Sequence, residues 1–393
     1  MKKLLFSLMM LVTLFTTQVA MAEKTSNPQV ITDLLNRIGG SGAAARFETA
    51  INTDLAGEKF IIGSLNDKPY VEGTNAIAVA TGINWYLNHY AHINLTWNKL
   101  STDLVNASLP LPGETIEKAS AVDLRYYLNY CTYSYTCAMW TEERWMQEID
   151  WMALHGINMP LMLVGLDCVW YDLYTKSEYG YNYTAEEISN YIAGPAFQAW
   201  WGMINCEGHG GPNPAWWYER SRALAQNMLA RMRAYGMEPV LPGFCGEVPS
   251  NLKGKLNDDS EINTGGKWQG FAAPGLMGHK STNWATLAAN FYDALKNVMG
   301  TSKYYSMDPF HEGATGLTGS SASNKTEYFQ SCYAQMKKNV GEGVVWVAQD
   351  WGTNPTDEML DGLKKGEMLV LDLFAEADPH YSVQMMKKHL KRG

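Results

Sequence analysis

Residues 141–164 read TEERWMQEIDWMALHGINMPLMLV, and this stretch decides the fold class. Thr141 is a suitable N-cap, acidic residues fill the first turn after it, and apolar residues then recur on one face, as in an amphipathic helix. Gly156 ends the predicted helix, and the apolar run 157–164 that follows is typical of a buried strand. Helix, glycine and buried strand in this order predict βα units and a parallel sheet.

The same order recurs along the chain, where the predicted helices 220–235 and 282–299 each end at a glycine before an apolar run. The pattern predicts six strands, at 125–132, 157–164, 237–244, 303–310, 344–351 and 368–374. Six strands fit either a doubly wound sheet or an incomplete (β/α)8 TIM barrel, because a closed barrel needs eight. No GxGxxG motif follows these strands, so nothing supports the nucleotide-binding form of the doubly wound fold.

Two segments precede this α/β region. Residues 1–22 combine two lysines, a short apolar run and a small-x-small site, which predicts a signal peptide cleaved near Ala22 and export to the periplasm or the extracellular space. Residues 23–115 predict a small N-terminal α/β domain that ends in the linker 109–115, which is rich in proline and glycine. Residues 116–393 are then assigned to the TIM-barrel domain.

The composition limits the class of ligand. The chain has 393 residues and a net charge of -9, which disfavours nucleic acid as a partner. The rings of its 14 Trp and 22 Tyr are suited to pack against the flat faces of sugars.

After the signal segment no apolar run reaches the length of a membrane span, about 18 residues. Six cysteines without a CxxC pair predict no zinc site, and we expect neither a metal nor a cofactor.

Polar or acidic residues follow every predicted strand, and in a βα barrel these carboxyl ends carry the active site. Glu312, beside His311 after the fourth strand, lies where a general acid would reach a glycosidic oxygen; the alternative is an acid that caps a helix or pairs with a lysine. Candidates for a second carboxylate, for which a structural role is favoured, are Asp308, Asp350, Asp372 and Glu376. Taken singly, Trp200, Trp201, Trp216, Trp217 and His209 also favour structural roles.

Several motifs carry a family resemblance. The stretches RYYLNYCTYSY (125–135), RWMQEIDWMALHGIN (144–158), GPAFQAW (194–200), GMEPVLPGF (236–244) and LVLDLFAE (369–376) resemble alpha-N-acetylglucosaminidases of glycoside hydrolase family 89. The resemblance runs from about residue 28 to 381. It implies a small N-terminal α/β domain, a (β/α)8 barrel and a C-terminal all-helical domain. It also implies release of terminal alpha-linked N-acetylglucosamine from a glycan, by an exo-acting enzyme that retains the anomeric configuration.

The resemblance also assigns residues. Glu312 in DPFHE matches the family's acid/base, although the family commonly has Asn where this chain has His311. The positions that match sugar-binding residues are Asn129 and Cys131 after the first strand, and Trp200, Asn205 and Trp351 elsewhere in the pocket.

The family places its nucleophile after strand seven, and retention needs that second carboxylate. Here only 19 residues follow Phe374, and the last of them, MMKKHLKRG (385–393), have no recognised counterpart in the family. We therefore expect a chain without the last strands, the nucleophile and the helical domain, and with impaired activity. Two alternatives stay open: a non-catalytic N-acetylglucosamine-binding protein, and an inverting hydrolase of another glycoside in which an acid such as Glu376 activates water.

Overall fold

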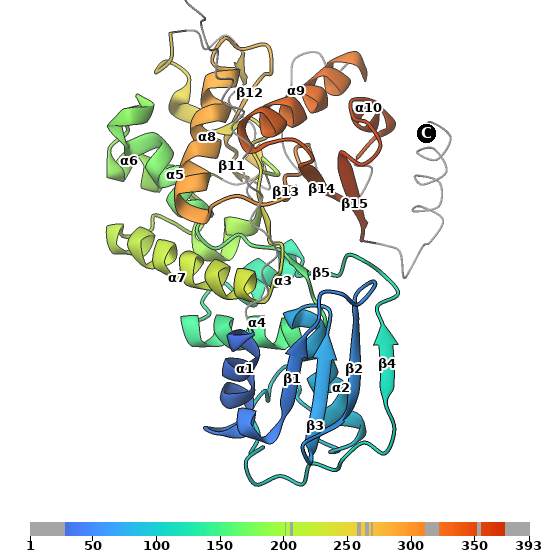
Figure 1. The fold of residues 1–393 in the computed structure, drawn as a ribbon. Helices are drawn as coiled ribbons and strands as arrows, with labels where there is room; N and C mark the ends of the chain where they lie inside the picture. Colours follow the sequence, from blue (N-terminus) through green and yellow to red (C-terminus); the bar gives the residue numbers. More distant parts are fainter. Residues whose placement is uncertain are drawn as a thin grey trace, which may run out of the picture.

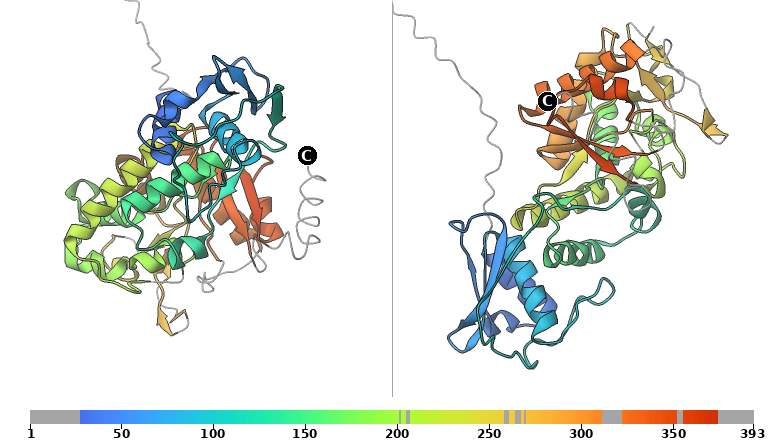
Figure 2. Two further views of the ribbon diagram at one scale, coloured as in Figure 1. Left: turned by 90° about the horizontal axis from the view of Figure 1, so that it is seen from below. Right: turned by 90° about the vertical axis from the view of Figure 1, so that its right-hand side faces the viewer.

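The computed structural model describes residues 28–200, 202–204, 207–257, 261–263, 267–268, 270–310, 322–351 and 355–373. Figure 1 shows an N-terminal α/β domain, coloured blue to teal, and a larger domain of helices and strands beside it. The right-hand view in Figure 2 shows the N-terminal domain as a separate lobe. Within the described residues, no helix has both the length and the apolar character that crossing a membrane requires.

In the N-terminal domain one helix packs on a mixed sheet, and a second helix packs against the first. The elements of this domain are α1 (Gln29–Gly39), the 3-10 helix η1 (Ala43–Arg46), β1 (Glu48–Ile51), β2 (Lys59–Leu65), β3 (Lys68–Gly73), α2 (Ala76–His89) and β4 (Ile116–Ala119). The strand order is β1-β3-β2-β4, with β1 parallel to β3 and the other pairs antiparallel. Because β4 follows the predicted linker 109–115 and pairs with β2, the sheet of this domain extends to Ala119.

The described residues of the second domain include six parallel strands. They are β5 (Tyr126–Tyr127), β6 (Met159–Pro160), β7 (Val240–Pro242), β13 (Tyr304–Ser306), β14 (Val345–Asp350) and β15 (Met368–Asp372). Parallel pairing joins β5 to β6, and β7, β13, β14 and β15 in turn, while a parallel bridge between Leu161 and Val240 joins the two groups. Strands that neighbour one another in chain order are the arrangement of a TIM barrel, so the predicted α/β barrel architecture is confirmed. Among the described residues β5 and β15 do not pair, and the barrel is open there.

Helices cover the outside of these strands. They are α3 (Tyr130–Tyr135), α4 (Glu142–Leu154), α5 (Leu166–Thr175), α6 (Ala185–Tyr191), α7 (Ala215–Ala234), α8 (Trp284–Met299), α9 (Ala322–Val340) and α10 (Asp357–Asp361). The predicted helices 141–154, 220–235 and 282–299 are α4, α7 and α8, and Thr141 caps α4 by accepting a hydrogen bond from the backbone N–H of Arg144 at 3.3 Å. Contacts run in turn from α4 to α7, α8 and α9 (Figure 1).

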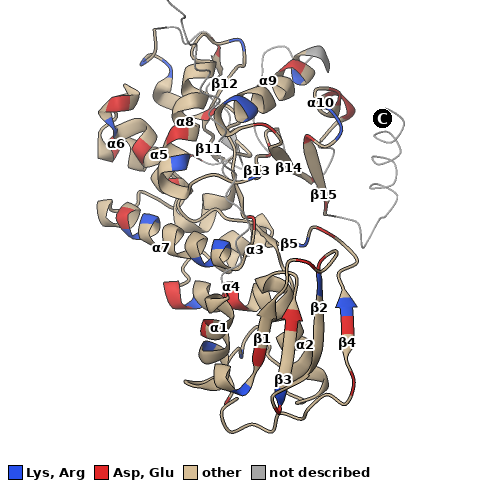
Figure 3. Cartoon of the chain, in the orientation of Figure 1, with Lys and Arg blue, Asp and Glu red and all other residues tan. Residues whose placement is uncertain are grey.

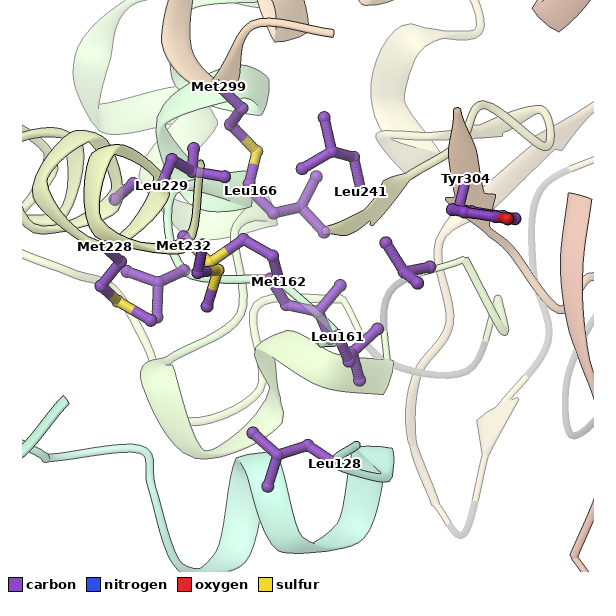
Figure 4. Packing of buried hydrophobic residues seen from close by; sticks show 14 of the residues in the cluster. Leu128, Leu161, Met162, Leu166, Met228, Leu229, Met232, Leu241, Met299 and Tyr304 are labelled. Atoms are coloured by element: carbon purple, nitrogen blue, oxygen red, sulfur yellow. The ribbon is translucent and has the colours of Figure 1, made fainter. Parts of the chain in front are cut away.

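The main apolar core lies between this helix layer and the strands. Figure 4 shows Met228, Leu229 and Met232 of α7 close to Leu166 of α5 and Met299 of α8, and all five side chains are buried. Methionine is common in this core because its flexible thioether fills irregular gaps between helices.

Several elements were not predicted. The strand expected over 125–132 ends at Tyr127, because Asn129 caps α3 and the chain turns into a helix. After β7 the chain makes an antiparallel excursion of very short strands: β8 (Glu247–Val248), β9 (Ile262–Asn263) and β12 (Gly275–Met277), with the hairpin β10 (Lys267–Trp268) and β11 (Phe271–Ala272). Strands of two or three residues are too short to show an alternating hydrophobic pattern.

A partly buried ion pair, in which Asp150 is buried and Arg37 is exposed, joins the two domains. Arg37 of α1 donates two hydrogen bonds to the carboxylate of Asp150 in α4, at 2.7 and 2.9 Å. The hydroxyl of Tyr235, just after α7, donates to the same carboxylate at 2.7 Å, and Arg231 lies 3.4 Å from it. Figure 3 shows the charged positions of α1 and α4 where these helices approach each other. Several partners therefore satisfy the buried carboxylate of Asp150, as a buried charge requires.

Candidate active site

The carboxyl ends of the six parallel strands form one edge of the sheet. Asn129 follows β5, Glu247 comes after β7, Asp308 after β13, and Trp351 directly after β14. Since this edge carries the active site in TIM-barrel enzymes, the candidate site is built from these strand ends.

Asn129 and Cys131 lie where the chain turns from β5 into α3. The side-chain oxygen of Asn129 accepts a hydrogen bond from the backbone N–H of Thr132 at 2.7 Å, and so caps the helix. The preceding residue, Leu128, has φ +74°, a left-handed conformation that is costly for a leucine. Both Asn129 and Cys131 are exposed, which makes them accessible to a ligand at this edge.

Trp200 ends the 3-10 helix η3 (Pro195–Trp200), which packs against α3. Its ring lies 5.0 Å from the ring of Tyr135, and the hydroxyl of Ser134 accepts a hydrogen bond from the backbone N–H of Ala199 at 3.2 Å. Trp200 itself is mostly buried, whereas Tyr135 is 71% exposed. The fold therefore brings Trp200 to the helix that Asn129 and Cys131 begin.

Two predicted residues lie on neighbouring strands at the same edge. Trp351 is 40% exposed, so part of its ring is accessible from solvent. Asp308, a candidate second carboxylate, is buried, and both of its oxygens accept hydrogen bonds from Gln349. The carboxylate of Asp308 thus holds two strand ends together, in agreement with the structural role that the sequence favoured.

Glu247 is a prominent acid at this edge that the sequence analysis did not assign to the site. Its side chain is 1% exposed, and its Oε2 accepts hydrogen bonds from the backbone N–H groups of Gly202 and Ile204. Burial raises the pKa of Glu247 to about 8, and the charge of Glu207 contributes, although hydrogen bonds from these two backbone groups and Tyr191 lower it. Glu247 is therefore largely protonated at neutral pH and unsuited to act as a nucleophile.

A cavity lies beneath this edge, and the residues that line it include Tyr130, Trp170, Gly202, Cys245, Glu247 and Ser306. The hydroxyl groups of Tyr130 and Ser306 contact each other across it. Burial and the nearby charge of Asp308 raise the pKa of Tyr130 well above its ordinary value, so its hydroxyl stays protonated. The cavity thus combines neutral polar groups with apolar walls.

Five residues named from the sequence lie outside the described residues: Glu312, the predicted acid/base, its neighbour His311, Trp201, Asn205 and Glu376. Phe310 is the last described residue before Glu312 and has φ +74°. Like Leu128 before Asn129, it is a non-glycine residue in the left-handed region at a strand end. Such conformations cost free energy and tend to occur at functional sites.

Other residues considered from the sequence have structural partners. Trp217 donates a hydrogen bond to the buried Asp167 at 2.7 Å. The ring of His209 lies 4.2 Å from each of the rings of Phe197 and Phe271. Trp216 is 61% exposed at the start of α7.

The described part of the chain contains no group of three or more His, Cys, Asp or Glu side chains arranged to hold a metal ion. Within it, Cys131, Cys137, Cys168, Cys245 and Cys332 are free thiols, and only Cys131 is exposed.

Comparison with known families matches both domains. The family model of the alpha-N-acetylglucosaminidase (NAGLU) N-terminal domain matches residues 29–112, and that of the NAGLU tim-barrel domain matches residues 125–390. The second match includes most of the basic segment 385–393, so the expectation that this segment has no family counterpart was wrong.

Human alpha-N-acetylglucosaminidase is 30% identical over 383 residues, which cover 92% of this chain and 50% of the human protein. The chain thus spans about half the length of that relative. A double Glu-to-Gln variant of the family 89 glycoside hydrolase from Clostridium perfringens, in complex with its substrate GlcNAc-alpha-1,4-galactose, superimposes with a TM-score of 0.80 at 31% identity, covering 93% of this chain and 41% of that one. The same bacterial enzyme in complex with PUGNAc also gives 0.80, at 32% identity over 92% of this chain and 40% of that one.

Proposed function

Because this chain belongs to the alpha-N-acetylglucosaminidase family, glycoside hydrolase family 89, we propose that it acts on glycans that end in alpha-linked N-acetylglucosamine. The proposed reaction is exo-hydrolysis with retention of the anomeric configuration. The substrate class is supported by the Clostridium perfringens relative, whose complex contains GlcNAc-alpha-1,4-galactose.

The observation that carries the proposal is the position of four residues relative to the carboxyl ends of the parallel strands. Asn129 and Cys131 lie where α3 begins after β5, Trp200 packs against that helix, and Trp351 directly follows β14. An amide, a thiol and aromatic rings suit a sugar, which offers hydroxyl groups along its rim and C–H groups on its faces. We propose that these four residues, with Asn205, bind the sugar.

We propose Glu312 as the general acid/base. Glu312 comes six residues after the end of β13 in the sequence, and in the proposed role it would protonate the leaving glycosidic oxygen. A retaining enzyme pairs this acid with a nucleophilic carboxylate about 5–5.5 Å away. Among the described acids, Asp308 and Glu247 are both held by backbone hydrogen bonds, so we assign the nucleophile to neither of them.

The signal segment 1–22 supports export, and we propose that the protein acts in the periplasm or outside the cell. Its substrate would then be a glycan found outside the cytoplasm.

Incubation of the purified chain with an aryl alpha-N-acetylglucosaminide tests the proposal. Release of N-acetylglucosamine with retained anomeric configuration by NMR supports it, and an inverted product would point to the alternative glycosidase. If calorimetry detects N-acetylglucosamine binding while no sugar is released, the chain is a binding protein, and the catalytic part of the proposal is wrong.

A further inference from the structure

Beside the candidate site, two segments far apart in the sequence are joined by side-chain carboxylates. Each segment supplies one carboxylate, which accepts hydrogen bonds from the other segment. The first segment, 202–207, follows Trp200; the second, 245–250, follows β7. Glu247 of the second segment accepts hydrogen bonds from the backbone N–H groups of Gly202 at 2.8 Å and Ile204 at 3.2 Å.

The first segment returns the same kind of contact. Glu207 accepts hydrogen bonds from the backbone N–H of Ser250 at 3.1 Å and from its hydroxyl at 2.8 Å. Each segment therefore supplies one carboxylate to the backbone of the other. We call this pair of contacts, made by Glu207 and Glu247, the carboxylate clasp.

The backbone that Glu247 holds is strained. Ile204 has φ +59°, which a β-branched residue rarely adopts, and Gly202 has φ +84°. The Ile204 side chain is buried, so the surrounding structure fixes this conformation. Without the two hydrogen bonds to Glu247, both backbone N–H groups would lose their partner beside the cavity.

The clasp also connects to two strand ends. The carbonyl oxygen of Gly202 accepts hydrogen bonds from the backbone N–H of Asp308 at 3.2 Å and from the thiol of Cys245 at 3.5 Å. Gly202 is two residues from Trp200, and Asp308 leads into the segment that carries Glu312. One peptide unit thus links Trp200, a proposed sugar-binding residue, to the strand that precedes Glu312, the proposed acid.

We propose that Glu247 and Glu207 are positioning residues, which hold the backbone of residues 202–204 and thereby fix Trp200 for sugar binding. The part of the proposal that concerns the sugar rests on the proposed function; the clasp itself does not.

Charge makes the clasp sensitive to pH. The titratable groups that interact with Glu247 from the elements around it are Glu207, Tyr174, Tyr191, Tyr328 and Cys245. Among the described residues, neither glutamate forms an ion pair with a lysine or arginine. Burial raises the pKa of both carboxyl groups, so each is favoured in its neutral form. At alkaline pH two negative charges would face each other without a cation, and we expect the clasp to loosen.

Hydrogen exchange of the full chain tests the clasp directly. In Glu247→Ala, the amides of Gly202 and Ile204 should lose at least tenfold of their protection, whereas Glu247→Gln should keep it because the amide oxygen still accepts both hydrogen bonds. Asp167→Asn is the matched control: Asp167 is another buried acid, but its partners are Trp217 and Ser221, so protection at 202–204 should not change.

If Glu247→Ala does not fold, the pH dependence of hydrogen exchange in the other variants still tests the proposal. After correction for intrinsic exchange, protection at 202–204 in the wild type should fall above pH 8, and in Glu247→Gln it should stay level. Glu207→Gln removes a charge that opposes ionisation of Glu247. In this variant the midpoint of the loss of protection at 202–204 should therefore move to lower pH. Equal protection in the wild type and Glu247→Gln at every pH above 8 would overturn the proposed pH sensitivity of the clasp.

Calorimetric titration with 2-acetamido-1,2-dideoxynojirimycin, which a family 89 relative binds, tests the link to the sugar. Affinity should fall at least tenfold in Glu247→Ala and be recovered in Glu247→Gln. Unchanged affinity in a Glu247→Ala chain whose protection is lost would overturn the positioning role. A wild type that binds no ligand, with the exchange results as expected, would contradict the proposed function and leave the clasp supported.

Discussion

The carboxylate of Asp308 accepts two hydrogen bonds from Gln349, one from the backbone N–H at 2.8 Å and one from the side-chain amide at 3.1 Å. The pairing of Ser306 with Val347 continues through this contact, because Asp308 and Gln349 are each two residues further along. The side chain of Asp308 therefore extends the β13–β14 pairing beyond the last backbone pair. It fixes the spacing between the strand end that precedes Glu312 and the one that precedes Trp351.

We predict that Asp308→Ala lowers the free energy of unfolding by about 1–3 kcal/mol, because two buried donors of Gln349 lose their acceptor. Asp308→Asn should cost less, since its carbonyl oxygen still accepts one of the two hydrogen bonds. Urea denaturation of both variants measures the difference. Equal losses in the two variants would show that hydrogen bonding at this position is not the cause.

We predict that Glu312→Gln lowers glycosidase activity toward substrates with a poor leaving group by roughly 10²–10⁴-fold, because an amide does not protonate the glycosidic oxygen. The loss should be much smaller with an activated aryl leaving group, which departs without a proton. Glu219→Gln, an exposed glutamate in α7, is the control and should be fully active. An unchanged rate with the poor leaving group would refute the assignment of Glu312.

We predict that Trp351→Ala weakens binding of 2-acetamido-1,2-dideoxynojirimycin more than it weakens folding. Trp351 is 40% exposed, so the loss of stability should be well below the ~3–5 kcal/mol expected for a buried tryptophan. Trp346 in β14, the strand that precedes Trp351, is fully buried, and Trp346→Ala is the matched control with that larger loss. Thermal melts and calorimetric titration of both variants decide the matter, and a melt of Trp351→Ala as poor as that of Trp346→Ala contradicts the prediction.

We predict that the wild type loses stability relative to Glu247→Gln as the pH rises from about 4.5 to 8. The folded-state pKa of Glu247 is raised to about 8, so folding favours its protonated form. Its contribution to stability is therefore fully present below the unfolded-state pKa and is lost as the pH rises through the folded-state value, by at most about 1.4 kcal/mol per pH unit. Parallel pH-dependent melts measure the difference, and two parallel curves would contradict a raised pKa.

The barrel strands β6, β7 and β13 were predictable because each follows a helix and a glycine in the sequence. Residues 125–132 misled the prediction, since their tyrosines favour a strand while Asn129 acts through a local contact with the N–H of Thr132. Which residue acts as the N-cap became clear only from the structure, where the backbone turns at Asn129 into α3.

The position of Glu247 after the third strand was visible in the sequence, and the same position after the fourth strand singled out Glu312. Its role was not visible, because it depends on burial and on backbone groups at 202–204 whose pairing with it has no sequence signal. Likewise the pairing of Glu207 with Ser250 is a product of tertiary structure alone.

The ion pair between Arg37 and Asp150 has a consequence for the order of assembly during synthesis. When the ribosome has released the chain as far as α4, the N-terminal sheet, Arg37 and Asp150 are all present, whereas Arg231 and Tyr235 have yet to be made. Domains generally fold from the N-terminus as they emerge. Arg37 is therefore available to the Asp150 carboxylate before Arg231 and Tyr235 are made, so the N-terminal domain can hold α4 in place before the third strand of the barrel is synthesised.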